Sequence, residues 1–181
     1  MSRSSRGHRR WSDQPPRGWC TAGGVVVDPV SGRVAVVRIR REHRQGNSGW
    51  TWPKGRIDCE EDPLRAAIRE VHEESGVLAA PVAAIALLRT RRALRHYFLL
   101  TKLRDDDAHG HETLLVRWVT LGKAKRLLDR RRDRVVLKAA RRTLAAIRRV
   151  ATSELGTRPS CGPSPPLLSL VETAASDARA A

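Results

Sequence analysis

The sequence has few cysteines, few aromatic residues and no long apolar run, and each shortage excludes a class of protein. Three cysteines spread over 181 residues exclude a small disulfide-stapled domain and supply no C-x-x-C pair for zinc. No apolar stretch approaches the roughly 20 residues of a membrane-spanning helix, so we expect no membrane association. Unpaired cysteines fit a reducing compartment, which predicts a cytoplasmic protein. The length suits one domain with a hydrophobic core.

Acidic residues are also scarce relative to basic ones. Lys and Arg number 35 against 19 Asp and Glu, giving a formal net charge of +16. Such an excess is typical of proteins with polyanionic partners, which include nucleic acids, anionic membrane surfaces and phosphate-rich small molecules. Only five of the 35 basic residues are Lys, so a compositional bias toward Arg and Ala is an equal explanation. The charge alone therefore names no function.

Composition divides the chain into three parts. Residues 1–18 are rich in Ser, Arg, Gly and Pro and lack an apolar middle region, which predicts a disordered basic tail rather than a secretory signal. Residues 151–181 turn to Ser, Pro, Ala and Gly, which predicts a second disordered tail. The folded domain is expected over residues 19–150.

Strand and helix patterns alternate within that domain. β-branched runs separated by a turn predict two adjacent strands over residues 25–27 and 34–39. A helix is expected over residues 63–75, and helical periodicity returns after the last strand and continues to about residue 150. Further strands are expected over residues 82–89, 96–103 and 114–120. This order predicts an α/β fold, with a sheet that carries helices on its faces.

The helix over residues 63–75 carries clear end signals. Asp62 is a good N-cap and Pro63 suits the first helical position. Gly76 suits the residue after the helix, where a left-handed backbone is needed. The apolar residues at helical spacing should face the core, and they are Leu64, Ala67, Ile68 and Val71.

Three glutamates share another face of this helix. Glu70, Glu73 and Glu74 are spaced i, i+3 and i+4, so their like charges repel. Taken alone, such a set is more typical of a solvated acidic face. Converging carboxylates also form a site for Mg²⁺, which takes oxygen ligands and bridges to substrate phosphates. Glu61 could add a supporting carboxylate, and Arg69 could hold a carboxylate through a bidentate pair.

These residues resemble a known family motif. Gly55, Glu61 and the run over residues 69–77 match the Nudix box at its seven fixed positions and its two apolar positions. Residues 22–27 resemble the first core strand of that family. Residues 52–55 resemble the lead-in of the branch that cleaves dinucleoside polyphosphates and inositol pyrophosphates.

Two departures from the family pattern affect the expected substrate rather than the catalytic set. Asp58-Cys59-Glu60 stands where relatives often carry Pro-Gly, and Trp52 stands where they usually carry Leu. Both lie outside the fixed positions of the motif.

The resemblance implies an α/β/α sandwich around a mixed sheet and hydrolysis of a nucleoside diphosphate linked to another group. It implies Mg²⁺, or else Mn²⁺, as the cofactor. By motif match, the metal-binding carboxylates would be Glu70, Glu73 and Glu74. The Gly55 carbonyl would be a further ligand, Glu61 would support the ligands and Arg69 would orient them. One of the glutamates could accept the proton of the attacking water, and the sequence does not say which.

Candidates for substrate binding lie around this motif. Lys54 is a candidate phosphate contact, with a solvated lysine as the alternative. Tyr97 could stack on a base or belong to the core. Glu112 could supply an extra metal ligand or base. Three residues could line the cleft or form an ordinary polar strand face, and they are Arg38, Arg40 and His43.

The last helical segment, over residues 130–149, has one apolar side and one cationic side. The cationic side could contact nucleic acid or could only keep the protein soluble. Any contact with nucleic acid should be non-specific, because no aromatic residues are interleaved for base stacking. The favoured function is a pyrophosphohydrolase acting on a dinucleoside polyphosphate such as diadenosine tetraphosphate. Damaged nucleoside triphosphates and inositol pyrophosphates are alternative substrates. A nucleic-acid-binding module on a Nudix scaffold is the alternative of another class.

Overall fold

The computed structural model describes residues 19–39, 49–90, 93–106 and 113–154. Seven strands form one mixed sheet, with strand order β3-β2-β1-β6-β5, while β4 pairs with β1 and β7 with β2. The β1–β6 pair is parallel and the other pairs are antiparallel. The strands are β1 (Trp19–Val27), β2 (Val34–Ile39), β3 (Trp50–Thr51), β4 (Lys54–Arg56), β5 (Val77–Arg89), β6 (Ala93–Asp105) and β7 (Thr113–Val119).

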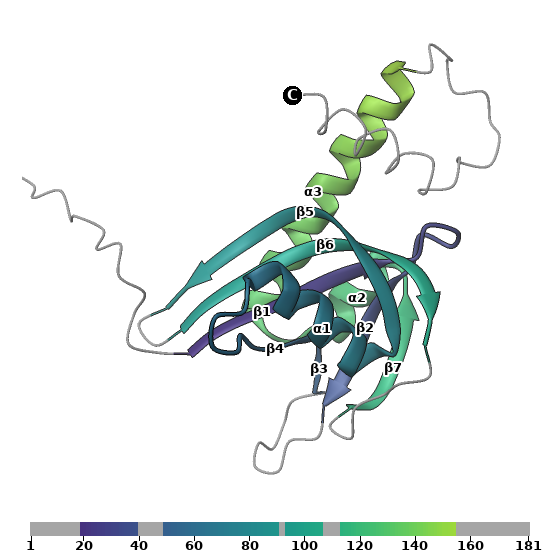
Figure 1. Cartoon of the computed structure of the whole chain (residues 1–181). Coiled ribbons are helices and arrows are strands. Elements are labelled where there is room, and N and C mark those ends of the chain that lie inside the picture. Colours follow the sequence, from purple (N-terminus) through teal and green to yellow (C-terminus); the bar gives the residue numbers. More distant parts are fainter. Residues whose placement is uncertain (1–18, 40–48, 91–92, 107–112, 155–181) are drawn as a thin grey trace, which may run out of the picture.

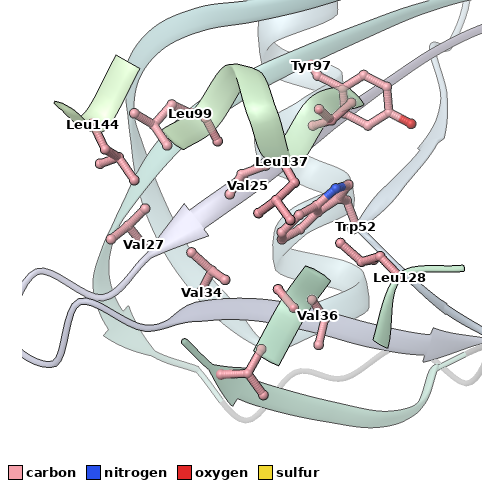
Figure 2. Close-up of a cluster of buried hydrophobic side chains, with 14 of the residues drawn as sticks. Val25, Val27, Val34, Val36, Trp52, Tyr97, Leu99, Leu128, Leu137 and Leu144 are labelled. Atoms are coloured by element: carbon pink, nitrogen blue, oxygen red, sulfur yellow. The ribbon is translucent and has the colours of Figure 1, made fainter. Parts of the chain in front are cut away.

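Helices cover both faces of this sheet. They are α1 (Pro63–Ser75), α2 (Leu121–Leu127) and α3 (Arg131–Glu154). Side chains alternate along β1, so Val25 and Val27 face one core cluster while Val26 faces another. The first cluster includes residues of α2 and α3 (Figure 2), and the second includes residues of α1. Figure 1 shows α1 on one side of the strands and α2 and α3 on the other. The predicted α/β/α sandwich around a mixed sheet is confirmed.

Several elements extend beyond their predicted bounds, and β5 and α3 are two of them. β5 begins at Val77, five residues before the predicted start, because β6 pairs with it along its whole length despite the weak strand preference of its alanines. α3 continues through residues 151–154, which composition had placed in the C-terminal tail, and Ala151 is 9% exposed. None of the helices in the described ranges is long and apolar enough to cross a membrane.

A buried acid holds the strand before the candidate site against α3. Asp133 is fully buried, and its carboxylate accepts a hydrogen bond from the Thr51 hydroxyl at 3.2 Å. Its backbone carbonyl accepts a hydrogen bond from the indole nitrogen of Trp52 at 3.0 Å. Trp52 is itself fully buried. These contacts fix the chain directly before Lys54 and Gly55.

Glycines in β1 let the next segment approach closely. The backbone N–H of Gly24 donates to the Pro53 carbonyl at 3.1 Å, and Gly23 pairs with Lys54 across the β1–β4 ladder. A Cβ on Gly23 would overlap the Pro53 carbonyl oxygen and Lys54. Only glycine therefore fits at this crossing, which places β4 beside the start of α1.

Candidate active site

Helix α1 forms as its end signals predict. The Asp62 carboxylate accepts hydrogen bonds from the backbone N–H groups of Leu64 and Arg65 at 2.8 and 3.3 Å. Gly76 ends the helix at φ 63°, and its N–H donates to the His72 carbonyl. The predicted stripe faces the core, where Ala67 and Val71 are fully buried and Leu64 and Ile68 pack against the cluster. The glutamate face of α1 therefore points toward β4 and the loop that precedes the helix.

Arg69 lies at the centre of that face. Its guanidinium donates two hydrogen bonds to Glu61, at 2.9 and 2.8 Å, and one each to Glu70 at 2.9 Å and Glu73 at 3.1 Å. A fifth hydrogen bond goes to the Arg56 carbonyl at 2.9 Å. These five bonds match the five N–H donors of a guanidinium. Arg69 thus joins β4, the loop and the helix through hydrogen bonds.

Ionisation in this network follows from these contacts. The hydrogen bonds that Arg69 donates to Glu61 raise the pKa of Arg69 and keep its guanidinium charged. The same hydrogen bonds lower the pKa of the Glu61 carboxyl. Burial raises the pKa of Glu70, and the hydrogen bond from Arg69 opposes that effect only in part. A cation beside Glu70 would favour its charged form.

Two of the glutamates contact Gly55 and Lys54. A Cβ on Gly55 would overlap the carboxylate of Glu70, so Glu70 lies directly against this glycine. The backbone N–H of Lys54 donates to the Glu74 carboxylate at 2.9 Å. Two carboxylates of α1 thus contact consecutive residues of β4.

The loop between β4 and α1 forms a tight turn. The Glu61 N–H donates to the Asp58 carbonyl, and the Asp58 N–H donates to the Glu61 carboxylate, both at 3.1 Å. Glu60 adopts φ 62°, a left-handed conformation that favours glycine. Asp58 also lies 3.7 Å from the Arg69 guanidinium. The sequence did not reveal this fourth acidic neighbour, because nothing in the spacing distinguishes Asp58 from a solvated loop residue.

The donor types fit a divalent cation, but the side chains are arranged around Arg69 instead. Among the residues that the structure describes, no group of three or more His, Cys, Asp or Glu is placed so that it could hold a metal ion. The expected convergence on one ion is therefore not the observed arrangement. Glu70 does place its carboxylate against Gly55, and Glu74 places its carboxylate against the backbone N–H of Lys54. Carboxylate oxygen is the ligand type that Mg²⁺ prefers. Arg69 binds one oxygen atom of Glu70 and one of Glu73, so each carboxylate keeps a second oxygen atom that Arg69 does not bind.

Tyr97 does not line this site. Its side chain is 1% exposed and lies in the core cluster with Trp52, on the side of the sheet that α3 covers (Figure 2). The prediction that it stacks on a base is wrong for this arrangement, because alternation along β6 turns its ring into the core. Burial also raises the pKa of its hydroxyl.

The remaining substrate candidates fall in different places. Lys54 lies on β4 within the site. Arg38 is exposed on β2, in register with Trp50 of β3 and Leu115 of β7, and this register connects it to neither α1 nor β4. Arg40, His43 and Glu112 lie outside the described residues.

Comparison with known proteins identifies the family. The NUDIX domain family matches residues 21–140, which is more than half of the chain. The chain therefore belongs to the Nudix family.

Curated relatives share the domain but differ in length. A relative from Mycobacterium tuberculosis that carries the mutator-protein name MutT4 is 34% identical over 117 residues, covering 56% of this chain and 46% of that protein. The RNA pyrophosphohydrolase of Halorhodospira halophila is 38% identical over 73 residues, covering 40% of this chain and 36% of that protein. This chain thus spans less than half the length of these two relatives.

Solved structures agree with the fold. A NUDIX hydrolase from Nitrosomonas europaea matches with a TM-score of 0.60 at 14% identity, covering 70% of this chain and 90% of that chain. A C. elegans Ap4A hydrolase matches with a TM-score of 0.55 at 22% identity, covering 71% of this chain and 98% of that chain. At such identities the likeness supports the fold alone.

Proposed function

We propose that this chain is a metal-dependent pyrophosphohydrolase that cleaves a phosphoanhydride bond in a nucleoside polyphosphate. The observation that carries the proposal is the placement of Glu70 and Glu74 against Gly55 and Lys54, with Arg69 holding the neighbouring carboxylates. A family member without activity would have little physical reason to keep three repelling glutamates on one helix face.

Each residue then has a defined task. Glu70, Glu73, Glu74 and the Gly55 carbonyl would hold Mg²⁺ or Mn²⁺, with Glu61 in support. The bound ion would neutralise phosphate charge and lower the pKa of a water molecule. Arg69 keeps Glu61 and Glu70 in place, and one of the glutamates accepts a proton from the attacking water. Lys54 lies beside these ligands, where its ammonium could contact a substrate phosphate.

The favoured substrate is a dinucleoside tetraphosphate such as diadenosine tetraphosphate. Two features support it: the Trp52-Pro53-Lys54-Gly55 segment, and the net charge of +16, which favours a long polyphosphate. Purified protein with Mg²⁺ should release nucleotide from diadenosine tetraphosphate, measured by chromatography. Glu74→Gln should reduce the rate at least about 100-fold. The matched control is Glu60→Gln, an exposed loop glutamate, which should keep the rate.

A 5′-triphosphorylated RNA is the second candidate substrate. It is favoured by relatives named RNA pyrophosphohydrolase, one of which is 30% identical over 129 residues and is covered over 80% of its length. The test compares the rate of pyrophosphate release from a short 5′-triphosphate RNA with the rate of diadenosine tetraphosphate cleavage. If the RNA reacts faster, it becomes the favoured substrate. Damaged nucleoside triphosphates and inositol pyrophosphates complete the substrate panel, each assayed with Mg²⁺ and with Mn²⁺. No turnover of any of these compounds would refute the enzymatic proposal.

A further inference from the structure

A cationic groove runs along α3, on the face of the sheet opposite α1. A cavity of about 520 Å³ lies beside α3, and an adjoining cavity of about 400 Å³ shares Arg141, Ala145 and Arg149 with it. Leu137 and Ala145 supply apolar surface in the larger cavity. Its six cationic lining residues are Lys125, Arg134, Lys138, Arg141, Arg142 and Arg149. We call these six residues the groove cations.

The positive charge in this groove is not balanced by nearby acids. Residues 121–154 contain twelve Lys and Arg against three Asp and Glu, and one of those acids, Asp133, is buried against Thr51. Within the described ranges, no carboxylate forms an ion pair with a groove cation. Arg134 and Arg149 donate to backbone carbonyls, which leaves their charge uncompensated. Mutual repulsion of these side chains would be relieved by a bound polyanion.

The shape of the groove favours a chain of phosphates over a single phosphate group. From Arg134 to Arg149 the helix rises by about 22 Å at 1.5 Å per residue, so the cations span a length greater than one nucleotide. A membrane surface suits this face less well, because the apolar side of α3 is already buried, with Val136 and Ala140 fully inaccessible. The exposed Ala145 can contact a sugar or base while the cations contact phosphates.

We infer that this groove binds the phosphate backbone of a single-stranded RNA, at a site separate from the catalytic face. The cavity contains no aromatic side chain among its described lining residues, so binding depends on charge and little on base sequence. The inference does not depend on which nucleotide the proposed enzyme cleaves. It assigns a ligand to the cationic side of α3, which the proposed hydrolysis does not use.

The test measures fluorescence anisotropy of a labelled oligoribonucleotide of mixed sequence with a 5′-hydroxyl end, which offers no phosphoanhydride bond. The groove variant is Lys138→Glu/Arg142→Glu. The matched control is Lys123→Glu/Arg131→Glu, which makes the same charge change at exposed positions of α2 and α3 outside the cavity. Circular dichroism and turnover of diadenosine tetraphosphate establish that both variants keep the fold and the proposed activity.

We expect the groove variant to lose at least about tenfold in affinity and the control less than about threefold. The slope of log affinity against log salt should become shallower by about 1.4 in the groove variant, since each lost phosphate contact removes about 0.7 for a single strand. Equal losses in both variants would overturn the inference, because net charge alone would then account for binding. Absence of RNA binding by the unmodified chain would also overturn it, as would groove-dependent binding to phosphatidylserine vesicles without RNA binding.

Discussion

The carboxylate of Glu70 lies against the α-carbon of Gly55, in the space that a side chain at residue 55 would occupy. This contact joins helix α1 to strand β4, and it gives a physical reason for the glycine at the start of the motif. The atoms that a Cβ would meet belong to the far end of a flexible side chain. A larger residue at this position would therefore displace the carboxylate and leave the fold intact.

Gly55→Ala should reduce turnover by at least about tenfold, because small displacements of catalytic groups are costly. Its free energy of unfolding should change by less than about 1 kcal/mol, because only a side-chain end has to move. Steady-state kinetics and urea denaturation measure the two effects. Gly122→Ala is the control, since a Cβ there would meet only the Thr120 hydroxyl, at an ordinary contact distance of 4.0 Å. Loss of stability in Gly55→Ala with full activity per folded molecule would contradict this relationship.

Arg69→Lys should reduce kcat by at least about tenfold while α1 remains folded. Lysine has three donors on one nitrogen atom, so it cannot replace the five hydrogen bonds to Glu61, Glu70, Glu73 and Arg56. Steady-state kinetics with Mg²⁺ measure the effect. Arg65→Lys, an exposed change in the same helix, should behave as the unmodified protein. An active Arg69→Lys protein would show that charge alone suffices at this position.

Much of α1 can be predicted from the sequence because its signals are local. Asp62, Pro63 and Gly76 act within a few residues of the backbone groups that they satisfy. The apolar stripe then fixes which face is buried, and the glutamates follow on another face. The start of β5 at Val77 could not be predicted in this way, because pairing with β6 decides it rather than the preference of its alanines.

The features of the candidate site that the sequence failed to predict depend on contacts between distant parts of the chain. Alternation places Tyr97 on one of two faces, but only the packing of α3 shows that this face is a core. The contact between Thr51 and Asp133 joins residues 82 positions apart, which no local pattern indicates. The turn at Glu60 helps to place the loop that carries Glu61 against Arg69. A left-handed backbone is usually predicted from a glycine, and this turn has Glu60 at that position.

Asp133→Ala should lower the free energy of unfolding by about 1–3 kcal/mol. The change removes the carboxylate that Thr51 donates to and leaves a buried hydroxyl to find another partner. Urea denaturation followed by tryptophan fluorescence measures this, since Trp52 lies beside the altered residue. Arg131→Ala, an exposed change two residues earlier, should remain within about 0.5 kcal/mol of the unmodified protein. Similar stabilities for both variants would show that Asp133 does not hold α3 to the strand.

Asp28→Ala should destabilise the protein more at pH 7 than at pH 3. Partial burial opposes ionisation of Asp28, but the hydrogen bonds from Ser31 and Val30 outweigh it, so its pKa lies below the usual value of 3.8. A lowered folded pKa gives stability that is present above pH 3.8 and is lost as pH falls through the folded value. The difference in unfolding free energy, about 1 kcal/mol at pH 7, should therefore shrink in acid. Val30→Ala, at an exposed turn residue, should show no such trend, and a constant difference for Asp28→Ala would refute the assignment.

The central claim is that the glutamates of α1 hold a divalent ion, and Mn²⁺ binding followed by electron paramagnetic resonance tests it most directly. The unmodified chain should bind Mn²⁺ and release it to excess Mg²⁺. Glu70→Gln and Glu74→Gln should each weaken binding at least about tenfold, a loss of about 1.4 kcal/mol, while Glu60→Gln binds normally. Equal Mn²⁺ affinity in all four proteins would contradict the claim.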